Sequence, residues 1–290
     1  GPQKIICRIT SIPAFLYEYK EELDFTRKKA AITSPKLVLD DVYYRKELIE
    51  ARDGEIKIEI LDAENPETIL GFNNFSVHIQ PYLHWDAKNY YYTLPAYMQP
   101  NDPLVVGVLK KAGEYVAEMG TIMCGYQWGS GETVVKQANA IYKALEDLNL
   151  HYISPPPSFE TVGQKIRIPH QVLHEESKQG TCLDLAILYA TCLEAASLNA
   201  LLVVIKGHAF AGVWTEDIGF GKSFIQESDM TEEIRQKMDR AFMPVECTTF
   251  TDGRGISFSQ AVEVGKKNMK EFRYIIDVQD SRAIGVHPVY

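Results

Sequence analysis

The pattern of apolar and polar residues indicates a β-rich first part of the chain. Residues 55–60 and 75–80 alternate between polar and apolar side chains, which is typical of strands with one buried face. Residues 4–10 form a further β-prone run, and Asp53-Gly54 is a turn signal before the second strand. We therefore expect a small antiparallel, sandwich-like domain over residues 1–100.

Two helices are predicted to follow, over residues 103–120 and 132–150. Asp102 is placed to cap the first of them, with Pro103 at the first helical position. Apolar residues recur with the helical period in the second. Together they form a helical lead-in over residues 101–157, which ends at the prolines 155–157 because proline interrupts regular structure.

From Cys182 onward the pattern becomes that of a buried core. Residues 183–196 are apolar nearly all round, which predicts a helix in the centre of a domain. The continuous apolar run 201–205 and residues 209–214 predict two interior strands joined by a tight link. The later elements are expected to be a charged helix capped by Ser228 and ending near Phe242, a strand over 244–250, a helix over 257–272 and a strand over 274–278. The second domain, residues 101–290, is therefore predicted to be α+β.

Composition and charge narrow the function classes. The 290 residues are 46% hydrophobic and 24% charged, which is ordinary globular composition. The net charge of −9 argues against direct nucleic-acid binding, which needs Lys and Arg to neutralise phosphates. The sequence contains no apolar run of about 18 residues and no visible signal peptide, so no membrane partner is expected. Five widely spaced cysteines without a CxxC pair indicate reduced thiols and a cytoplasmic location.

Three residues carry the chemistry that the sequence suggests. Cys182 stands at the predicted start of the buried helix, where the helix dipole and unpaired N–H groups favour a thiolate. His208 and Glu246 lie in strand-like sequence downstream. One helix, one strand and a tight return fit between Cys182 and His208, so the imidazole can come back beside the helix start. We predict Cys182 as nucleophile, His208 as general base and acid, and Glu246 as the group that orients the imidazole.

An oxyanion hole requires two donors. The backbone N–H of Cys182 is one candidate, and the other is a glutamine upstream of it: Gln164, Gln171 or Gln179. Gln164 is the preferred choice because a preceding loop can fold back over the helix start.

The remaining cysteines are expected to be small packing residues, with Cys247 on the strand face opposite to Glu246. His170 and His174 have a spacing that can bind zinc on a helix, but no third ligand is obvious nearby. We therefore expect neither a metal nor a cofactor.

The order of these segments resembles the transglutaminase-like thiol hydrolase superfamily, which includes permuted papain-like relatives and peptide N-glycanases. The resemblance is carried by residues 180–186, residues 207–210 and residues 245–248, and covers roughly residues 120 to 290. In the last segment Glu246 and Cys247 replace the Asp and Pro that the family usually has. The resemblance implies a papain-like cysteine protease domain with a central helix packed on an antiparallel sheet, and a Cys-His-acid triad.

A second resemblance concerns the whole chain. Residues 97–103 and the domain order look like the N-terminal part of large bacterial proteins linked to phage defence, in which such domains precede helicase and nuclease modules. Because the chain begins with Gly1-Pro2, we interpret these two residues as the remainder of a cleaved tag and expect a piece of a longer protein. Helicase and nuclease modules are then possible partners.

The function expected from the sequence is a cysteine-dependent amide hydrolase, with a peptidase preferred and a protein or peptide as substrate. A deamidase or transamidase with the same triad is one alternative. Transamidation requires a site that favours an amine over water, and no sequence feature indicates one. The other alternative is a non-catalytic peptide-binding module of a larger defence protein.

Overall fold

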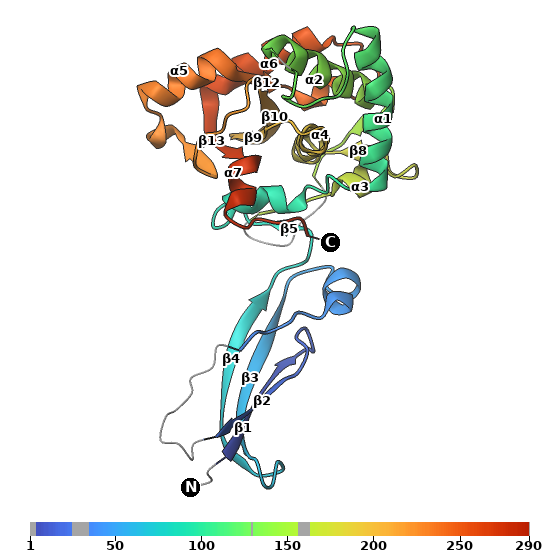
Figure 1. The fold of residues 1–290 in the computed structure, drawn as a ribbon. Helices are drawn as coiled ribbons and strands as arrows, with labels where there is room; N and C mark the ends of the chain where they lie inside the picture. The colour runs from blue at the N-terminus through green and yellow to red at the C-terminus, as the bar shows by residue number, and fades with distance from the viewer. Residues whose placement is uncertain (1–3, 25–34, 129, 156–162, 290) are drawn as a thin grey trace. The chain divides into compact units, whose positions relative to one another are not determined.

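The computed structural model describes residues 4–24, 35–128, 130–155 and 163–289. They form two compact units, Gly1–His84 and Trp85–Tyr290 (Figure 1). The main sheet of each unit is antiparallel, and helices occupy much of the second unit, in agreement with the predicted α+β class. Within the described residues, every helix is too short or too polar to cross a membrane.

The first unit contains one four-stranded sheet, where the sequence had predicted a sandwich. All neighbouring strands are antiparallel, in the order β2-β1-β3-β4. A cluster of Phe15, Leu16, Tyr43, Leu48 and Ile79 is buried in this unit, so a loop and a helical turn contribute to its core instead of a second sheet among the described residues. The alternating pattern correctly identified β3 and β4 as strands, but the expectation of one buried face fails in β4, where most side chains, including Phe75, are exposed. The strands are β1 (Lys4–Ile12), β2 (Tyr19–Asp24), β3 (Arg52–Asp62) and β4 (Ile69–Ile79).

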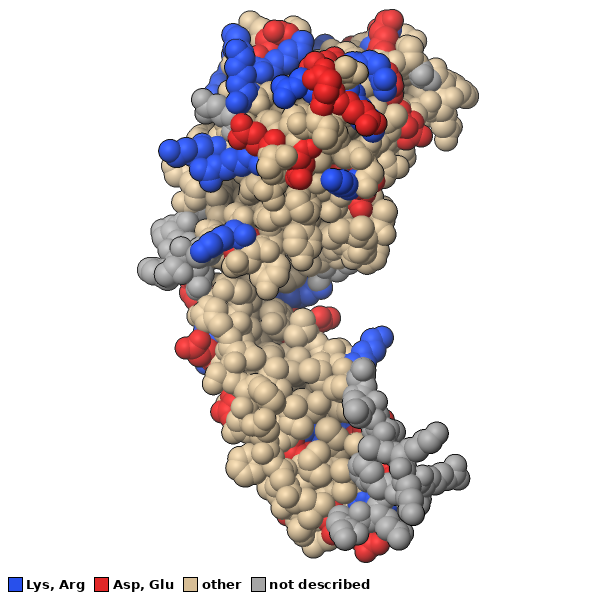
Figure 2. All heavy atoms as spheres, turned by 90° about the vertical axis from the view of Figure 1, so that its left-hand side faces the viewer, with Lys and Arg blue, Asp and Glu red and all other residues tan. Residues whose placement is uncertain are grey.

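The charged residues are distributed differently on the two units. On the face in Figure 2 the first unit is mostly uncharged, whereas the described surface of the second unit carries Lys and Arg interspersed with Asp and Glu. On that face the second unit therefore presents both signs of charge side by side.

The boundary between the units lies at His84/Trp85, and the predicted boundary at residue 100 is therefore wrong. Residues 85–100 belong to the second unit because their aromatic rings pack there. The centre of the Tyr91 ring lies 4.7 Å from the centre of the Phe224 ring and 5.1 Å from the centre of the Tyr274 ring. Leu94 and Met98 are completely buried.

A five-stranded antiparallel sheet forms the centre of the second unit, in the order β11-β13-β9-β10-β12. The strands predicted around residues 201–205, 209–214 and 274–278 are confirmed, whereas β11 was not predicted. The strand predicted over 244–250 ends at Val245, because the Glu246 side chain accepts the Thr248 N–H and starts a short 3₁₀ turn at Cys247–Phe250. The strands are β9 (Ala200–Ile205), β10 (His208–Trp214), β11 (Phe224–Gln226), β12 (Phe242–Val245) and β13 (Phe272–Asp277).

The helices of the second unit agree closely with the sequence pattern. Asp102 caps α1 by accepting the Leu104 N–H at 2.8 Å, as predicted. The cap of α5 is Thr231 and not Ser228, since the Thr231 hydroxyl accepts the Ile234 N–H. Pro156 and Pro157, at the predicted end of the lead-in, lie outside the described residues. The helices are α1 (Pro103–Glu118), α2 (Gly131–Glu146), α3 (Pro169–Leu173), α4 (Cys182–Ala195), α5 (Glu232–Ala241), α6 (Phe258–Asn268) and α7 (Val278–Ala283). Short strands are β5 (His84–Trp85), β6 (His151–Tyr152), β7 (Gln164–Lys165) and β8 (Gln179–Gly180).

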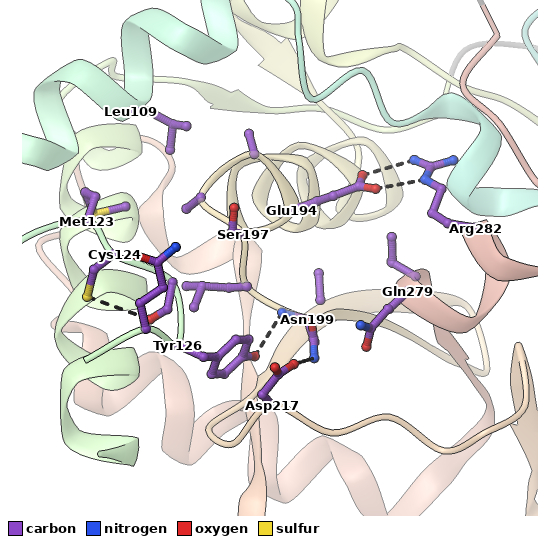
Figure 3. A pocket seen from close by; sticks show the side chains of 17 residues that line it. Leu109, Met123, Cys124, Tyr126, Glu194, Ser197, Asn199, Asp217, Gln279 and Arg282 are labelled. Carbon is purple, nitrogen blue, oxygen red and sulfur yellow. Dashed lines mark hydrogen bonds and ion pairs between the residues drawn. The ribbon is translucent and has the colours of Figure 1, made fainter. Parts of the chain in front are cut away.

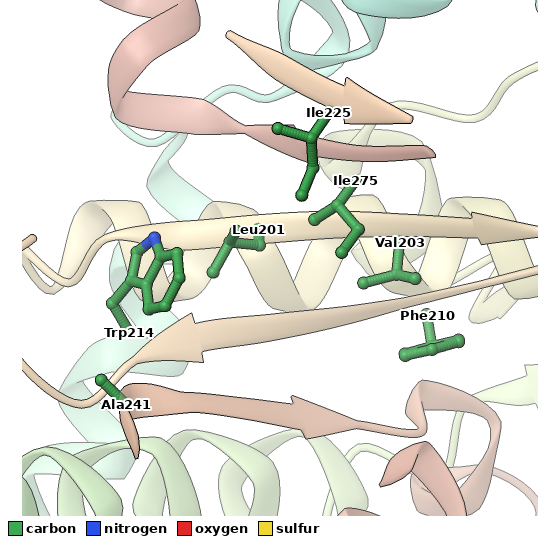
Figure 4. Packing of buried hydrophobic residues seen from close by; sticks show 7 residues of the cluster. All are labelled: Leu201, Val203, Phe210, Trp214, Ile225, Ala241 and Ile275. Atoms are coloured by element: carbon green, nitrogen blue, oxygen red, sulfur yellow. The ribbon is translucent and has the colours of Figure 1, made fainter. Parts of the chain in front are cut away.

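Helix α4 lies at the heart of this unit, as its apolar composition predicted. It contacts β9 and β10, with α1 and α2 beyond it, and α5 lies on the other side of the sheet (Figure 1). Figure 4 shows a cluster of large apolar side chains from β9, β10, β11 and β13. Gly212 in β10 is required there: a Cβ at this position would lie 2.3 Å from the Phe242 ring. This densely packed cluster lies on the face of the sheet that α5 covers, where Ile234 and Met238 pack against it.

Candidate active site

Cys182 is the first residue of α4, and a network of hydrogen bonds fixes the turn before it. Thr181 is the N-cap: its hydroxyl accepts the Asp184 N–H at 3.2 Å, and the Asp184 carboxylate accepts the Thr181 N–H at 2.9 Å. This reciprocal capping box satisfies two donors that a helix start leaves without intrahelical partners. The Cys182 side chain, next to this cap, is partly exposed.

Asp184 joins the helix start to the segment that precedes it. The residue is fully buried, and its carboxylate also accepts the Arg167 N–H at 2.9 Å, with the Arg167 guanidinium at 3.3 Å. Burial raises the pKa of this carboxyl above its usual range, and the hydrogen bonds with Thr181 and Arg167 oppose the rise. The backbone from Arg167 to the helix is therefore held by one buried acid.

His208 connects the cysteine to an acid. It is the first residue of β10, directly after Gly207, whose φ of 73° makes the tight return. One ring nitrogen, Nε2, donates to Glu246 Oε2 at 2.8 Å, and the ring lines the same cavity as Cys182. Nδ1 is then the nitrogen available to the sulfur. The neighbouring Cys182 side chain and the bond to Glu246 outweigh partial burial and raise the pKa of His208 to about 10, so the ring is an imidazolium at neutral pH.

Glu246 is buried but fully hydrogen-bonded. Its Oε1 accepts the N–H and hydroxyl of Thr248 at 3.1 and 2.9 Å, and its Oε2 accepts His208 together with Asn268 Nδ2 at 3.0 Å. Burial favours the neutral acid, but the bonds and positive charge of His208, with the Thr248 donors, lower the pKa of this carboxyl overall. The structure thus holds a carboxylate against the imidazolium. Asn268 and Thr248 were not anticipated from the sequence, in which no motif marks them.

Tyr152 is a third residue that was not anticipated from the sequence. Its strand, β6, pairs in parallel with β8, and Tyr152 lies opposite Gly180, two residues before the cysteine. It lines the same cavity as Cys182, and partial burial and the nearby Cys182 and Glu246 raise the pKa of its hydroxyl. Cys182 therefore has two polar neighbours, one imidazole and one phenol.

Of the three glutamines considered for the oxyanion hole, Gln164 lies at the helix start. Its Nε2 is 3.4 Å from the Thr181 hydroxyl, and it lines the same cavity as Cys182. The side chain of Gln171 instead accepts the Ile168 N–H at the start of α3. Gln179 lies in β8 and does not line that cavity.

The predicted site residues open onto one cavity of about 600 Å³. Cys182, His208, Gln164 and Tyr152 all line it, and Glu246 lies behind His208. Its other lining residues include Trp85, Leu183, Val204, Ile205 and Tyr274, most of them apolar. This volume and lining are typical of a pocket for a small ligand or for part of a peptide.

A larger cavity of about 770 Å³ lies at the opposite end of α4 (Figure 3). It contains a cysteine, Cys124, but its described lining includes no histidine that could act as base. Its charged side chains pair with polar groups of the protein: Glu194 with Arg282 at 2.8 Å, and Asp217 with the Asn199 amide at 3.0 Å. The cavity at Cys182 is therefore the better candidate for a reaction.

The other cysteines are in less favourable surroundings. Cys192 and Cys247 are buried, as predicted, and burial raises the pKa of both thiols. Burial also raises the pKa of Cys7, which is partly exposed. Cys124 is partly exposed at the cavity of Figure 3 rather than packed in the core.

The histidine pair at positions 170 and 174 has a structural explanation. The His170 ring lies 2.9 Å from the carboxylate of Asp102, the cap of α1. Throughout the part of the chain that the structure describes, no group of three or more His, Cys, Asp and Glu side chains is arranged to hold a metal ion.

Comparison of the chain with protein-family models, with curated proteins and with solved structures gives no match. The comparisons therefore identify no family, and the resemblance to the transglutaminase-like superfamily stays a prediction from the sequence.

Proposed function

We propose that this protein is a cysteine-dependent amide hydrolase of the transglutaminase-like type, and specifically a peptidase. One observation carries the proposal: Cys182, at the head of a buried helix, and His208 line the same cavity, and His208 is hydrogen-bonded to Glu246 at 2.8 Å. A sulfur, an imidazole and a carboxylate in this order are what thiol-based acyl transfer requires.

In the proposed first half-reaction, the Cys182 thiolate attacks the carbonyl carbon of the scissile amide and forms a carbon–sulfur bond. The carbonyl electrons move to oxygen, giving a tetrahedral oxyanion. The imidazolium of His208 then donates its proton to the leaving nitrogen as the carbon–nitrogen bond breaks. An amine leaves, and a thioester remains on Cys182.

In the second half-reaction, His208 is neutral and accepts a proton from a water molecule as the water attacks the thioester. The carbon–sulfur bond breaks and releases the acid, and the thiolate–imidazolium pair is restored. Glu246 stays ionised throughout and keeps the ring oriented, because its four hydrogen bonds favour the carboxylate against the opposing effect of burial.

The oxyanion is proposed to bind at the start of α4. The N–H of Cys182, as the first helical residue, lacks an intrahelical acceptor, and Gln164 Nε2 is the second donor. To serve in this way, the Gln164 side chain must turn from the Thr181 hydroxyl towards the cavity. The present distance of 3.4 Å between Gln164 Nε2 and that hydroxyl is long for a hydrogen bond, so breaking this contact costs little free energy.

A protein or peptide is the substrate class that this proposal entails. A cytoplasmic location, and an association with helicase and nuclease modules in phage defence, belong to the same proposal and are supported by the composition and by the resemblance of residues 97–103.

Turnover of a quenched-fluorescence peptide library tests the proposal, with Cys182→Ala and His208→Ala as variants and Cys124→Ser as the matched cysteine control. Both site variants are expected to lose at least about 10³-fold in kcat/KM, while the control retains activity. Mass spectrometry of the products distinguishes a cleaved amide from deamidation or amine transfer. A Cys182→Ala protein with wild-type turnover contradicts the assignment of the nucleophile.

A further inference from the structure

The active-site cavity has a charge opposite to that of the chain. The chain carries a net charge of −9, yet the described lining of this cavity includes Lys88 and Arg273 and not one Asp or Glu. A locally positive pocket attracts negative ligands more strongly than the overall charge suggests.

Arg273 reaches the cavity from an irregular point in β13. Phe272 pairs with Ile205 and Tyr274 pairs with Val204, so Arg273 is the extra residue between two consecutive pairs. Such a β-bulge redirects a side chain, and bulges are frequent beside active sites.

Neither cation is engaged by a described carboxylate. The recorded ion pairs among described residues do not include Lys88 or Arg273, and both side chains are exposed at the cavity. Arg282, by contrast, forms an ion pair with Glu194 at 2.8 Å. Two unengaged cations facing one cavity are therefore available for a ligand.

The wall next to these cations is aromatic. Trp85 and Tyr274 lie edge to face with their ring centres 6.5 Å apart, and Trp85 is buried. Such a wall can pack against the stem of a side chain while the cations bind its end.

We infer that the substrate carries a carboxylate side chain, Asp or Glu, within about two residues of the scissile amide, and that Arg273 and Lys88 bind it. This inference rests on the proposed function. Because both cations are exposed, each is expected to change the preference for an acidic residue by up to about fivefold, and both together by about tenfold or more.

The test uses peptides with an electrophilic vinyl sulfone in place of the scissile amide and Glu, Gln or Lys in the adjacent positions. The rate at which each probe labels Cys182 is measured by intact mass and peptide mapping, in wild type and in Arg273→Ala and Lys88→Ala proteins. Lys110→Ala, which removes an exposed lysine on α1, is the matched control.

The Glu probe is expected to label Cys182 fastest, the Gln probe more slowly, and the Lys probe most slowly. This order should weaken in each alanine variant, weaken with added salt, and reverse in the double variant Lys88→Glu/Arg273→Glu. Circular dichroism checks that each variant is folded.

Labelling of Cys182 at equal rates by all three probes overturns the inference and leaves the proposed function standing. Labelling that does not favour Cys182 over Cys124 overturns both. A further outcome concerns the source of the negative charge. If a short single-stranded oligonucleotide slows the labelling of Cys182, and a Glu-containing peptide without the electrophile does not, the inference that the acidic group belongs to a peptide is overturned.

Discussion

The Nε2–H of His208 donates to Glu246 Oε2 across 2.8 Å, joining the first residue of β10 to the residue that follows β12. The two strands are antiparallel neighbours, with Ala211 opposite Val245. The start of one strand therefore lies beside the end of the other, and the register of the sheet brings the base and the acid together.

The first prediction concerns the pH dependence of activity. The pKa of His208 is raised to about 10, so kcat/KM is expected to fall as pH rises through about 10 and the imidazolium loses its proton. In Glu246→Gln the carboxylate no longer supports the charged ring, and this alkaline limb is expected to move towards lower pH. A pH–rate profile of both proteins measures the shift. An unchanged limb in the variant means that His208 is not the group that titrates.

The same pair predicts how stability depends on pH. The folded-state pKa of His208 lies above its ordinary 6.5, so its contribution is fully present below pH 6.5 and is lost as pH rises from there through about 10. Glu246 has a lowered pKa, so its contribution is present above about 4.5 and is lost as pH falls below that value. Urea midpoints are expected to decline at both ends, with a smaller alkaline decline in Glu246→Gln.

Asn268 is predicted to act as a positioning residue. Its amide donates to the same Glu246 oxygen as His208, at 3.0 Å, so Asn268→Ala leaves that carboxylate less firmly held. Losing a hydrogen bond to a charged group costs about 1.5 kcal/mol, which corresponds to about tenfold in kcat with little change in KM. Lys267→Ala, the exposed neighbour, is the control. An increase in KM alone would indicate a different function for Asn268.

A matched pair of glycines tests the packing of the sheet. Gly212→Ala places a Cβ 2.3 Å from the Phe242 ring and 3.0 Å from the Met243 carbonyl, so destabilisation by about 1–3 kcal/mol is expected. Gly113→Ala, inside α1, meets nothing within 4 Å and is expected to stabilise the protein by about 0.5–1 kcal/mol. Urea denaturation measures both. Equal midpoints for the two variants would contradict this account of the β10 face.

The sequence could predict those parts of the fold that depend on local signals. The cap at Asp102, the buried helix from Cys182 and the two strands that follow it each have a clear apolar pattern or capping residue. Cys182, His208 and Glu246 could be selected because their residue types match a known chemistry and the elements between them have the right lengths. The cavity shared by Cys182 and His208 and the hydrogen bond between His208 and Glu246 agree with that selection.

Other features depend on contacts between distant segments, which a pattern of apolar residues does not reveal. Tyr152 reaches Cys182 through two strands of only two residues each, and Asn268 reaches Glu246 from the end of a helix. The unit boundary was placed too late because proline punctuation marked the helix start, whereas the packing of Tyr91 decides where the unit begins.

Helix α4 is enclosed by other residues from Leu183 to Leu193, and the sulfur proposed as nucleophile belongs to Cys182, just before this stretch. The sulfur therefore cannot shift by a rearrangement of a surface loop alone, since the helix that carries it is confined by its neighbours. Mutations that alter substrate choice are then expected to accumulate around the rim of the cavity, at positions such as Lys88, while the interior conserves the alignment of the nucleophile.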